Sequence, residues 1–161
     1  MKPIKFISYA TLQLTPGEIA RQILDLDKWR EFPGWGLLPS IRSAEFEVKT
    51  PEIVGTRIRV VNSDGSRHVE QIVAWLPGET LQLHMVDFSP PLSRLATHFV
   101  ETWVFKREDA TFVSRIFELY PRSWLTRLPL TLIAWMLKRA IKRHGQIIAN
   151  GAARPEVSDQ A

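Results

Sequence analysis

Three side chains have the types and spacing for acid–base chemistry. His68 and Glu70 stand two residues apart in an alternating stretch, so both side chains share one face of a strand. Glu101 lies in a second stretch of this kind. Apolar surroundings raise the pKa of a carboxyl group because burial disfavours its charged form, and such a group suits a general acid or base. His68 would then orient Glu70 or relay a proton.

The same carboxyl groups also fit a structural role. Arg57, Arg59 and Arg115 occupy other strand-like stretches and are available as partners across a sheet. A glutamate paired with one of them would form an ion pair, or would orient a ligand by a hydrogen bond. Both interpretations of Glu70 and Glu101 are open, so the sequence does not decide whether the protein is an enzyme.

Other kinds of site find no support in the residues. The chain has no cysteine, which excludes disulfide bonds and thiolate chemistry. Apart from His68 with Glu70, the histidines show no metal-ligand spacing, so we expect no metal. We find neither a glycine-rich phosphate loop nor a serine with a base in a known order, and we expect no cofactor.

The elements that position these residues follow an α+β order. Residues 5–14 alternate as a first strand, and Thr15-Pro16 with Glu18 forms a capping box that starts a helix. A second short helical piece stops at Pro33-Gly34. Turn signals such as Ser63-Asp64-Gly65 and Pro77-Gly78 then separate strands. We predict these strands at residues 44–50, 56–62, 67–75, 80–88, 98–106 and 111–120.

A long last helix is predicted to begin at residues 121–123 and to run to about 150–151, before a flexible tail at 151–161. Its residues 128–137 are almost wholly apolar but contain Pro129, and about 20 apolar residues are needed to span a membrane. We therefore expect the helix to pack on the sheet. The alternative is a weak contact with an anionic membrane through Trp124, Leu128 and Trp135.

The net charge of +4 is concentrated in this helix. Residues 121–151 hold six lysines and arginines and no acid, so the rest of the chain is net negative. Nucleic-acid binding usually shows a broader basic face or a recognisable module, so we expect no nucleic-acid partner. The first residues lack an apolar signal-peptide core, and we predict a cytoplasmic protein.

Short motifs along this element order resemble the SRPBCC superfamily of START-like, helix-grip proteins, in particular its polyketide cyclase/dehydrase and lipid transport group. The motifs are LTPGE at 14–18, DLDKW at 25–29, FPG at 32–34, GTR at 55–57, EQI at 70–72, Trp75, PG at 77–78 and ETWVF at 101–105. The resemblance implies one domain over residues 1–150, in which a curved antiparallel sheet grips the C-terminal helix around a cavity. It implies no single activity, because members include carriers, sensors, cyclases and dehydratases.

Turn chemistry predicts part of the cavity wall. A two-residue turn at Pro77-Gly78 sets Glu70 opposite Met85, Ile72 opposite Leu83 and Ala74 opposite Leu81, and leaves Asp87 on that inner face. A three-residue loop at 63–65 adds Ile58 and Val60. A turn at Glu108-Asp109 would join the last two strands, but alternation does not decide which face points inward. By analogy with the family we expect Phe99, Glu101, Trp103, Phe105, Phe112, Ser114 and Ile116 inside.

We therefore predict binding of a small apolar or amphipathic, lipid- or polyketide-like molecule between the sheet and the last helix. One alternative is a cyclase- or dehydratase-type enzyme with Glu70 or Glu101 as acid/base. Another is a peripheral membrane lipid-transfer protein, and a homodimer is also left open. The predicted ligand-binding residues are Trp35, Ile58, Val60, Glu70, Ile72, Leu83, Met85, Glu101, Trp103, Phe105, Leu132 and Trp135.

Overall fold

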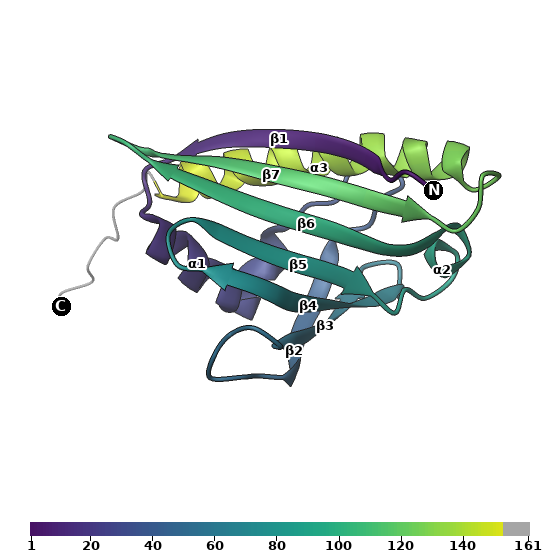
Figure 1. Cartoon of the computed structure of the whole chain (residues 1–161), viewed down its shortest axis with the longest axis horizontal. Helices are drawn as coiled ribbons and strands as arrows, with labels where there is room; N and C mark the ends of the chain where they lie inside the picture. The colour runs from purple at the N-terminus through teal and green to yellow at the C-terminus, as the bar shows by residue number, and fades with distance from the viewer. Residues whose placement is uncertain (153–161) are drawn as a thin grey trace.

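The structure, a computed structural model, describes residues 1–152, and these residues contain one antiparallel sheet of seven strands. The strand order is β1-β7-β6-β5-β4-β3-β2, so β1 and β2 form the two edges (Figure 1). The strands are β1 (Ile4–Leu12), β2 (Ile41–Val48), β3 (Arg57–Asn62), β4 (Arg67–Leu76), β5 (Thr80–Val86), β6 (Ala96–Arg107) and β7 (Thr111–Pro121).

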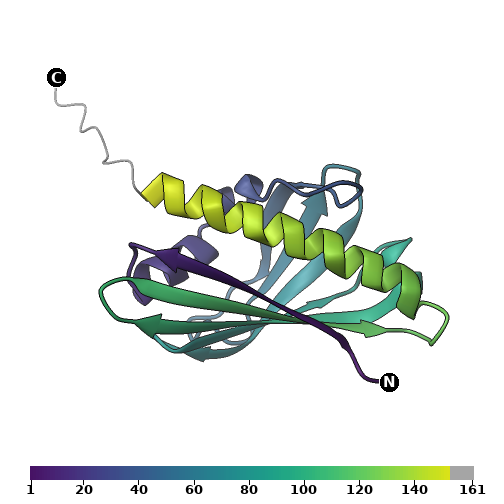
Figure 2. The same cartoon turned by 90° about the horizontal axis from the view of Figure 1, so that it is seen from above.

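Helices cover one face of this sheet. Two short ones follow β1, namely α1 (Pro16–Leu24) and the 3-10 helix η1 (Leu26–Glu31), and α2 (Leu92–Leu95) precedes β6. The long helix α3 (Arg127–Ala152) lies across the sheet, with its C-terminal end near α1 (Figure 2). The predicted α+β fold class is confirmed. Residues 153–161, most of the predicted tail, lie outside the described residues.

The two predicted helix starts have different outcomes. The capping box before α1 is confirmed, because the Glu18 amide donates to Thr15 Oγ1 at 3.2 Å and the Thr15 amide donates to Glu18 Oε2 at 2.7 Å. The predicted start of α3 at residues 121–123 is wrong. Pro121 still belongs to β7, opposite Ala96, and the first helical bond runs from the Leu130 amide to the Thr126 carbonyl.

The hairpin between β6 and β7 corrects the predicted register. Its loop has three residues, 108–110, because Arg107 pairs with Thr111. This extra residue sets Trp103 opposite Arg115, whereas a turn at Glu108-Asp109 would set it opposite Ser114. A shift of one residue turns a whole strand over. The inward side chains of β7 are therefore Val113, Arg115 and Phe117, and the predicted Phe112, Ser114 and Ile116 face outward.

Two of the three predicted pairs on the β4–β5 hairpin are confirmed, but for a different reason than the predicted turn. Its loop also has three residues, 77–79, but a β-bulge between Ile72 and Ala74 restores the register. Ile72 thus lies opposite Leu83, and Glu70 lies opposite Met85, as predicted. Ala74 lies opposite Gln82 instead of Leu81, because it falls on the turn side of the bulge.

Two apolar clusters fill the space between the sheet and α3. In the first cluster, Ile19 of α1 packs with the strand residues Ile72 and Phe105, and Ile148 near the end of α3 lies against them. In the second, the middle of α3 packs on β6 and β7 through Leu130, Ala134, Leu137, Ile141, Phe99, Phe117 and Leu119. Each large side chain buried in this way stabilises the fold by about 1.5–3 kcal/mol.

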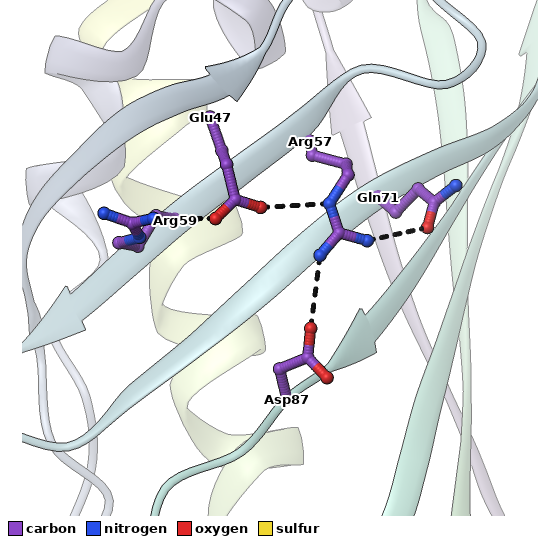
Figure 3. Close-up of polar contacts among 5 residues, drawn as sticks. All are labelled: Glu47, Arg57, Arg59, Gln71 and Asp87. Carbon is purple, nitrogen blue, oxygen red and sulfur yellow. Dashed lines mark hydrogen bonds and ion pairs between the residues drawn. The ribbon is translucent and has the colours of Figure 1, made fainter.

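A polar network occupies the opposite, outer face of the sheet (Figure 3). Arg57 donates to Glu47 at 3.0 Å, to Asp87 at 3.2 Å and to Gln71 at 3.3 Å, and Arg59 donates to Glu47 at 2.7 Å. Two of the three arginines considered as partners for the buried glutamates are therefore engaged elsewhere. Asp87, which we predicted on the inner face, has a positive φ of 55° that turns its side chain outward.

Candidate ligand-binding cavity

A cavity of about 460 Å³ lies between the inner face of the sheet and α3. Apolar side chains of β5 to β7 form one wall, and the inward stripe of α3 forms the other. The cavity reaches the surface at Leu37 and Leu132, which are both exposed. The apolar wall residues on these elements include Leu83, Met85, Phe99, Trp103, Phe117, Leu132, Ile133, Met136, Leu137 and Ile141.

Glu101 and Arg115 form a buried ion pair in the sheet wall of this cavity. Arg115 Nε donates to Glu101 Oε1 at 2.6 Å, and only 2% of Glu101 is exposed. Pairing of β6 with β7 makes the contact possible, since Arg115 lies opposite Trp103, two residues from Glu101. Burial raises the pKa of Glu101 above its ordinary value, and the charge of Arg115 opposes this shift.

His68 and Glu70 also lie in the wall. His68 Nε2 is 3.2 Å from Glu70 Oε1, and both side chains are largely buried. The pairing of β4 with its neighbours places Glu70 between Ile58 and Met85, which explains how a carboxyl group comes to stand in apolar surroundings.

Three buried polar atoms around the cavity have no hydrogen-bond partner within the described residues. They are Trp103 Nε1, Arg115 Nη1 and His144 Nδ1, and all three residues line the cavity. Arg115 and Trp103 are in direct contact, because the guanidinium carbon lies 4.0 Å from the centre of the indole ring. Burial lowers the pKa of His144 to about 4, and the charge of Arg115 acts in the same direction, so this imidazole is neutral at pH 7.

The sequence matches no family model and no curated protein, but solved structures resemble the fold closely. A Thermus thermophilus protein covers 94% of this chain and 100% of its own, with a TM-score of 0.68 and 14% identity. The match to an Arthrobacter aurescens protein covers 99% of this chain and 94% of that protein, with a TM-score of 0.65 and 15% identity. The match to major latex-like protein 151 of Panax ginseng covers 90% of this chain and 99% of that protein, with a TM-score of 0.59 and 15% identity.

The chain has a helix-grip fold, which it shares with these solved structures. At these identities the likeness concerns the fold alone. The predicted order of strand, short helices, antiparallel strands and C-terminal helix is the one that these structures share with the chain.

Six of the twelve predicted ligand-binding residues line the helix-grip cavity: Glu70, Leu83, Met85, Glu101, Trp103 and Leu132. The candidate acid–base residue His68 lines it as well.

The other six predicted ligand-binding residues lie outside the wall. Ile72 and Phe105 belong to the cluster that α1 and the end of α3 fill, and Ile58 and Val60 are fully buried on β3. Trp35 and Trp135 meet edge to face, with ring centres 4.8 Å apart, and neither lines the cavity.

Arg115, Phe117 and His144 are among the wall residues that the prediction missed. Arg115 and Phe117 were not predicted as wall residues, because the assumed two-residue turn gave their strand the wrong register. His144 escaped although a signal was present, since Ile133, Leu137 and Ile141 lead to it at helical spacing along the inward stripe of α3.

Two further findings concern the described part of the chain. No helix among residues 1–152 is long and apolar enough to cross a membrane. In the same residues, no three histidine, aspartate or glutamate side chains come together as a group that could hold a metal ion.

Proposed function

We propose that the protein binds one small apolar or amphipathic molecule between its sheet and α3. The observation that carries this proposal is the cavity itself. Its volume of about 460 Å³ falls in the range of about 300–1,000 Å³ that is typical of small-molecule sites. Its walls are apolar apart from a few polar groups, and this is the composition that binds by burying ligand surface and orients the ligand by a few hydrogen bonds.

Binding is better supported than acid–base catalysis of the cyclase or dehydratase type. Glu101 accepts a hydrogen bond from Arg115, and Glu70 lies within hydrogen-bonding distance of His68. Both carboxyl groups thus have partners in the wall, as expected of groups that hold a site in shape or orient a ligand.

Native mass spectrometry of the protein purified from cells tests the proposal. We expect an apolar molecule bound at one-to-one stoichiometry, which denaturing extraction would then identify. Leu132→Trp should lower the bound fraction, because Leu132 lines the cavity where it opens. The matched control is Leu128→Trp, one turn earlier on the exposed side of α3, which should leave binding unchanged. A ligand-free wild type that also fails to bind the neutral dye Nile red would overturn the proposal.

A second candidate function, contact with an anionic membrane, has its own supporting observation. Leu128, Leu132 and Trp135 form an apolar stripe on the outward side of α3, with 81% of Leu128 and 54% of Leu132 exposed. Arg139 and Lys142 continue the stripe at the same helical spacing, and both are exposed. Since Leu132 also lines the cavity opening, a bilayer on this stripe would face the route by which a lipid-like ligand enters.

Co-sedimentation with vesicles tests this contact. We expect binding to vesicles that contain phosphatidylserine, weaker binding at high salt, and little binding to pure phosphatidylcholine, because the cations act on anionic headgroups. Leu128→Glu and Lys142→Gln should each weaken it. The control Lys49→Gln removes one positive charge from an exposed residue outside this helix and should leave vesicle binding unchanged. Absence of binding, together with a dimer in solution that Leu128→Glu dissociates, would assign the stripe to a second copy of the chain instead.

A further inference from the structure

One arginine on the outward side of α3 lies against two tryptophan rings. The guanidinium carbon of Arg139 is 5.3 Å from the ring centre of Trp135 and 5.9 Å from that of Trp35. Trp35 belongs to the segment between η1 and β2, which runs beside the helix (Figure 2), and its ring meets Trp135 edge to face. Indole rings attract a guanidinium group, so the two tryptophans restrict the positions that this side chain can take.

Arg139 has the charge and the exposure to bind an anion. Its side chain is exposed, and none of the ion pairs within the described residues includes it. Glu31, at the end of η1, is paired with Lys28 at 3.3 Å. Residues 121–151 contain no acid, so the neighbouring positions on α3 supply only positive charge. The planar guanidinium offers a fork of N–H donors that matches two oxygens of a phosphate group.

The order of side chains along α3 favours a bilayer as the source of this anion. Exposed aliphatic residues come first, Trp135 follows, and two exposed cations come last: Leu128, Leu132, Trp135, Arg139 and Lys142. Leu128 and Arg139 are about 16 Å apart along the helix axis. Over a similar distance a bilayer changes from hydrocarbon, through an interface where tryptophan is enriched, to phosphate groups. An acidic protein surface would leave the leucines unexplained, and a second copy of the helix would add cations and no acid.

We propose that Arg139, held by Trp35 and Trp135, binds the phosphate group of an anionic phospholipid in a bilayer. The site favours a phosphate monoester, as in phosphatidic acid, whose phosphate is the outermost group of the lipid and has three free oxygens. Because Leu132 lines the cavity opening, a phospholipid held in this way has its acyl chains beside the route into the cavity. This inference rests on the proposed membrane contact and adds to it the chemical group that the helix recognises.

Two kinds of anionic vesicle test the recognition of phosphate by the wild-type protein. Phosphatidylcholine vesicles carry either phosphatidic acid or phosphatidylserine, and both are adjusted to the same zeta potential so that the general electrostatic attraction is equal. Co-sedimentation measures the affinity for each kind. We expect the vesicles with phosphatidic acid to bind about tenfold more tightly, as one additional charge-assisted hydrogen bond implies.

Substitutions that conserve charge locate the site, with the ratio of the two affinities as the readout. Arg139→Lys keeps the charge but loses the planar fork, and it should remove most of the preference for phosphatidic acid. The matched control Arg143→Lys makes the same change on another exposed side chain one turn later, and it should keep the preference.

A second pair of variants tests the aromatic contact. Trp135→Leu removes a ring beside Arg139 and should lower the ratio of the two affinities. Trp124→Leu makes the same change on an exposed tryptophan before α3, and it should leave the ratio unchanged even where it weakens binding to both kinds of vesicle. Equal ratios in these two variants would overturn the part assigned to the rings.

The remaining outcomes separate the phosphate site from the membrane contact on which it rests. Equal affinity for both kinds of vesicle, or equal effects of Arg139→Lys and Arg143→Lys, overturns the phosphate site and leaves a general attraction to anionic membranes. Absence of binding to either kind overturns both. Glycerol 3-phosphate presents the same phosphate in solution, and release of the protein from vesicles by about 0.1 mM of it would overturn the bilayer as the source.

Discussion

At the scale of single residues, burial sets the charge states in the cavity wall. Glu101 and His144 are both shifted toward their neutral forms, the acid upward and the base downward, since burial disfavours charge on either. Arg115 contacts Glu101 through its Nε at 2.6 Å and so gives the buried carboxyl group a partner. A wall built in this way remains polar enough to orient a ligand without attracting an ion to the site.

The pKa of His144 predicts an acid-side loss of stability. Its value of about 4 in the folded protein lies below the ordinary 6.5, so the unfolded chain binds the proton more readily between these pH values. The buried, neutral His144 therefore stabilises the folded protein fully above pH 6.5. As the pH falls toward 4, the free energy of unfolding decreases by up to about 3 kcal/mol. Urea unfolding measures the free energy of unfolding between pH 7.5 and 4.5. This free energy should decrease less in His144→Gln than in the wild type. Parallel pH profiles would contradict the assignment.

At the scale of elements, the segment between η1 and β2 shapes the cavity opening. Two backbone hydrogen bonds of 3.0 Å between Trp35 and Leu38 close this segment into a tight turn. Gly34 precedes the turn with a φ of 63°. A Cβ at this position would lie 2.7 Å from backbone atoms of Pro39 and Ser40, so the close approach depends on glycine.

Two glycine substitutions separate close contact from backbone conformation. Gly78 also has a positive φ, of 81°, but a Cβ there would meet nothing within 4 Å. Gly78→Ala should cost about 1–2 kcal/mol, the price of a left-handed residue alone. Gly34→Ala should cost about 3 kcal/mol or more, because the neighbouring backbone must also move. Denaturant unfolding measures the free energy of unfolding of both variants. Equal decreases would show that the backbone around Gly34 accommodates a Cβ without additional cost.

At the scale of the whole molecule, packing divides the space between sheet and helix into a filled part and a hollow part. The first apolar cluster, completed by α1 and the last turns of α3, has Ile72 and Phe105 in its interior. The cavity lies beside it, and residues of both clusters contribute to its wall. The outward side of α3 divides similarly, into an apolar half and a basic half. One long helix thus completes the core, covers the cavity and presents the exposed stripe.

Local chemistry in the sequence determined much of this architecture. Thr15, Pro16 and Glu18 start α1 because each satisfies or tolerates a free backbone group at a helix end. Gly65, with a φ of 84°, closes the β3–β4 hairpin at the predicted length, and this places Ile58 and Val60 on the inner face. Alternation and turn signals of this kind act over a few residues, so they can be recognised without the rest of the chain.

Tertiary structure alone decided the cavity and its polar groups. Both faces of the β6–β7 hairpin are apolar, so alternation could not indicate that Arg115 rather than Ser114 points inward; the length of the loop decided it. Which part of the inner face is filled depends on where α1 and the end of α3 pack, and contacts between elements far apart in the sequence determine that. For the same reason Ile72 became core while Leu83, its neighbour across the strands, became cavity wall.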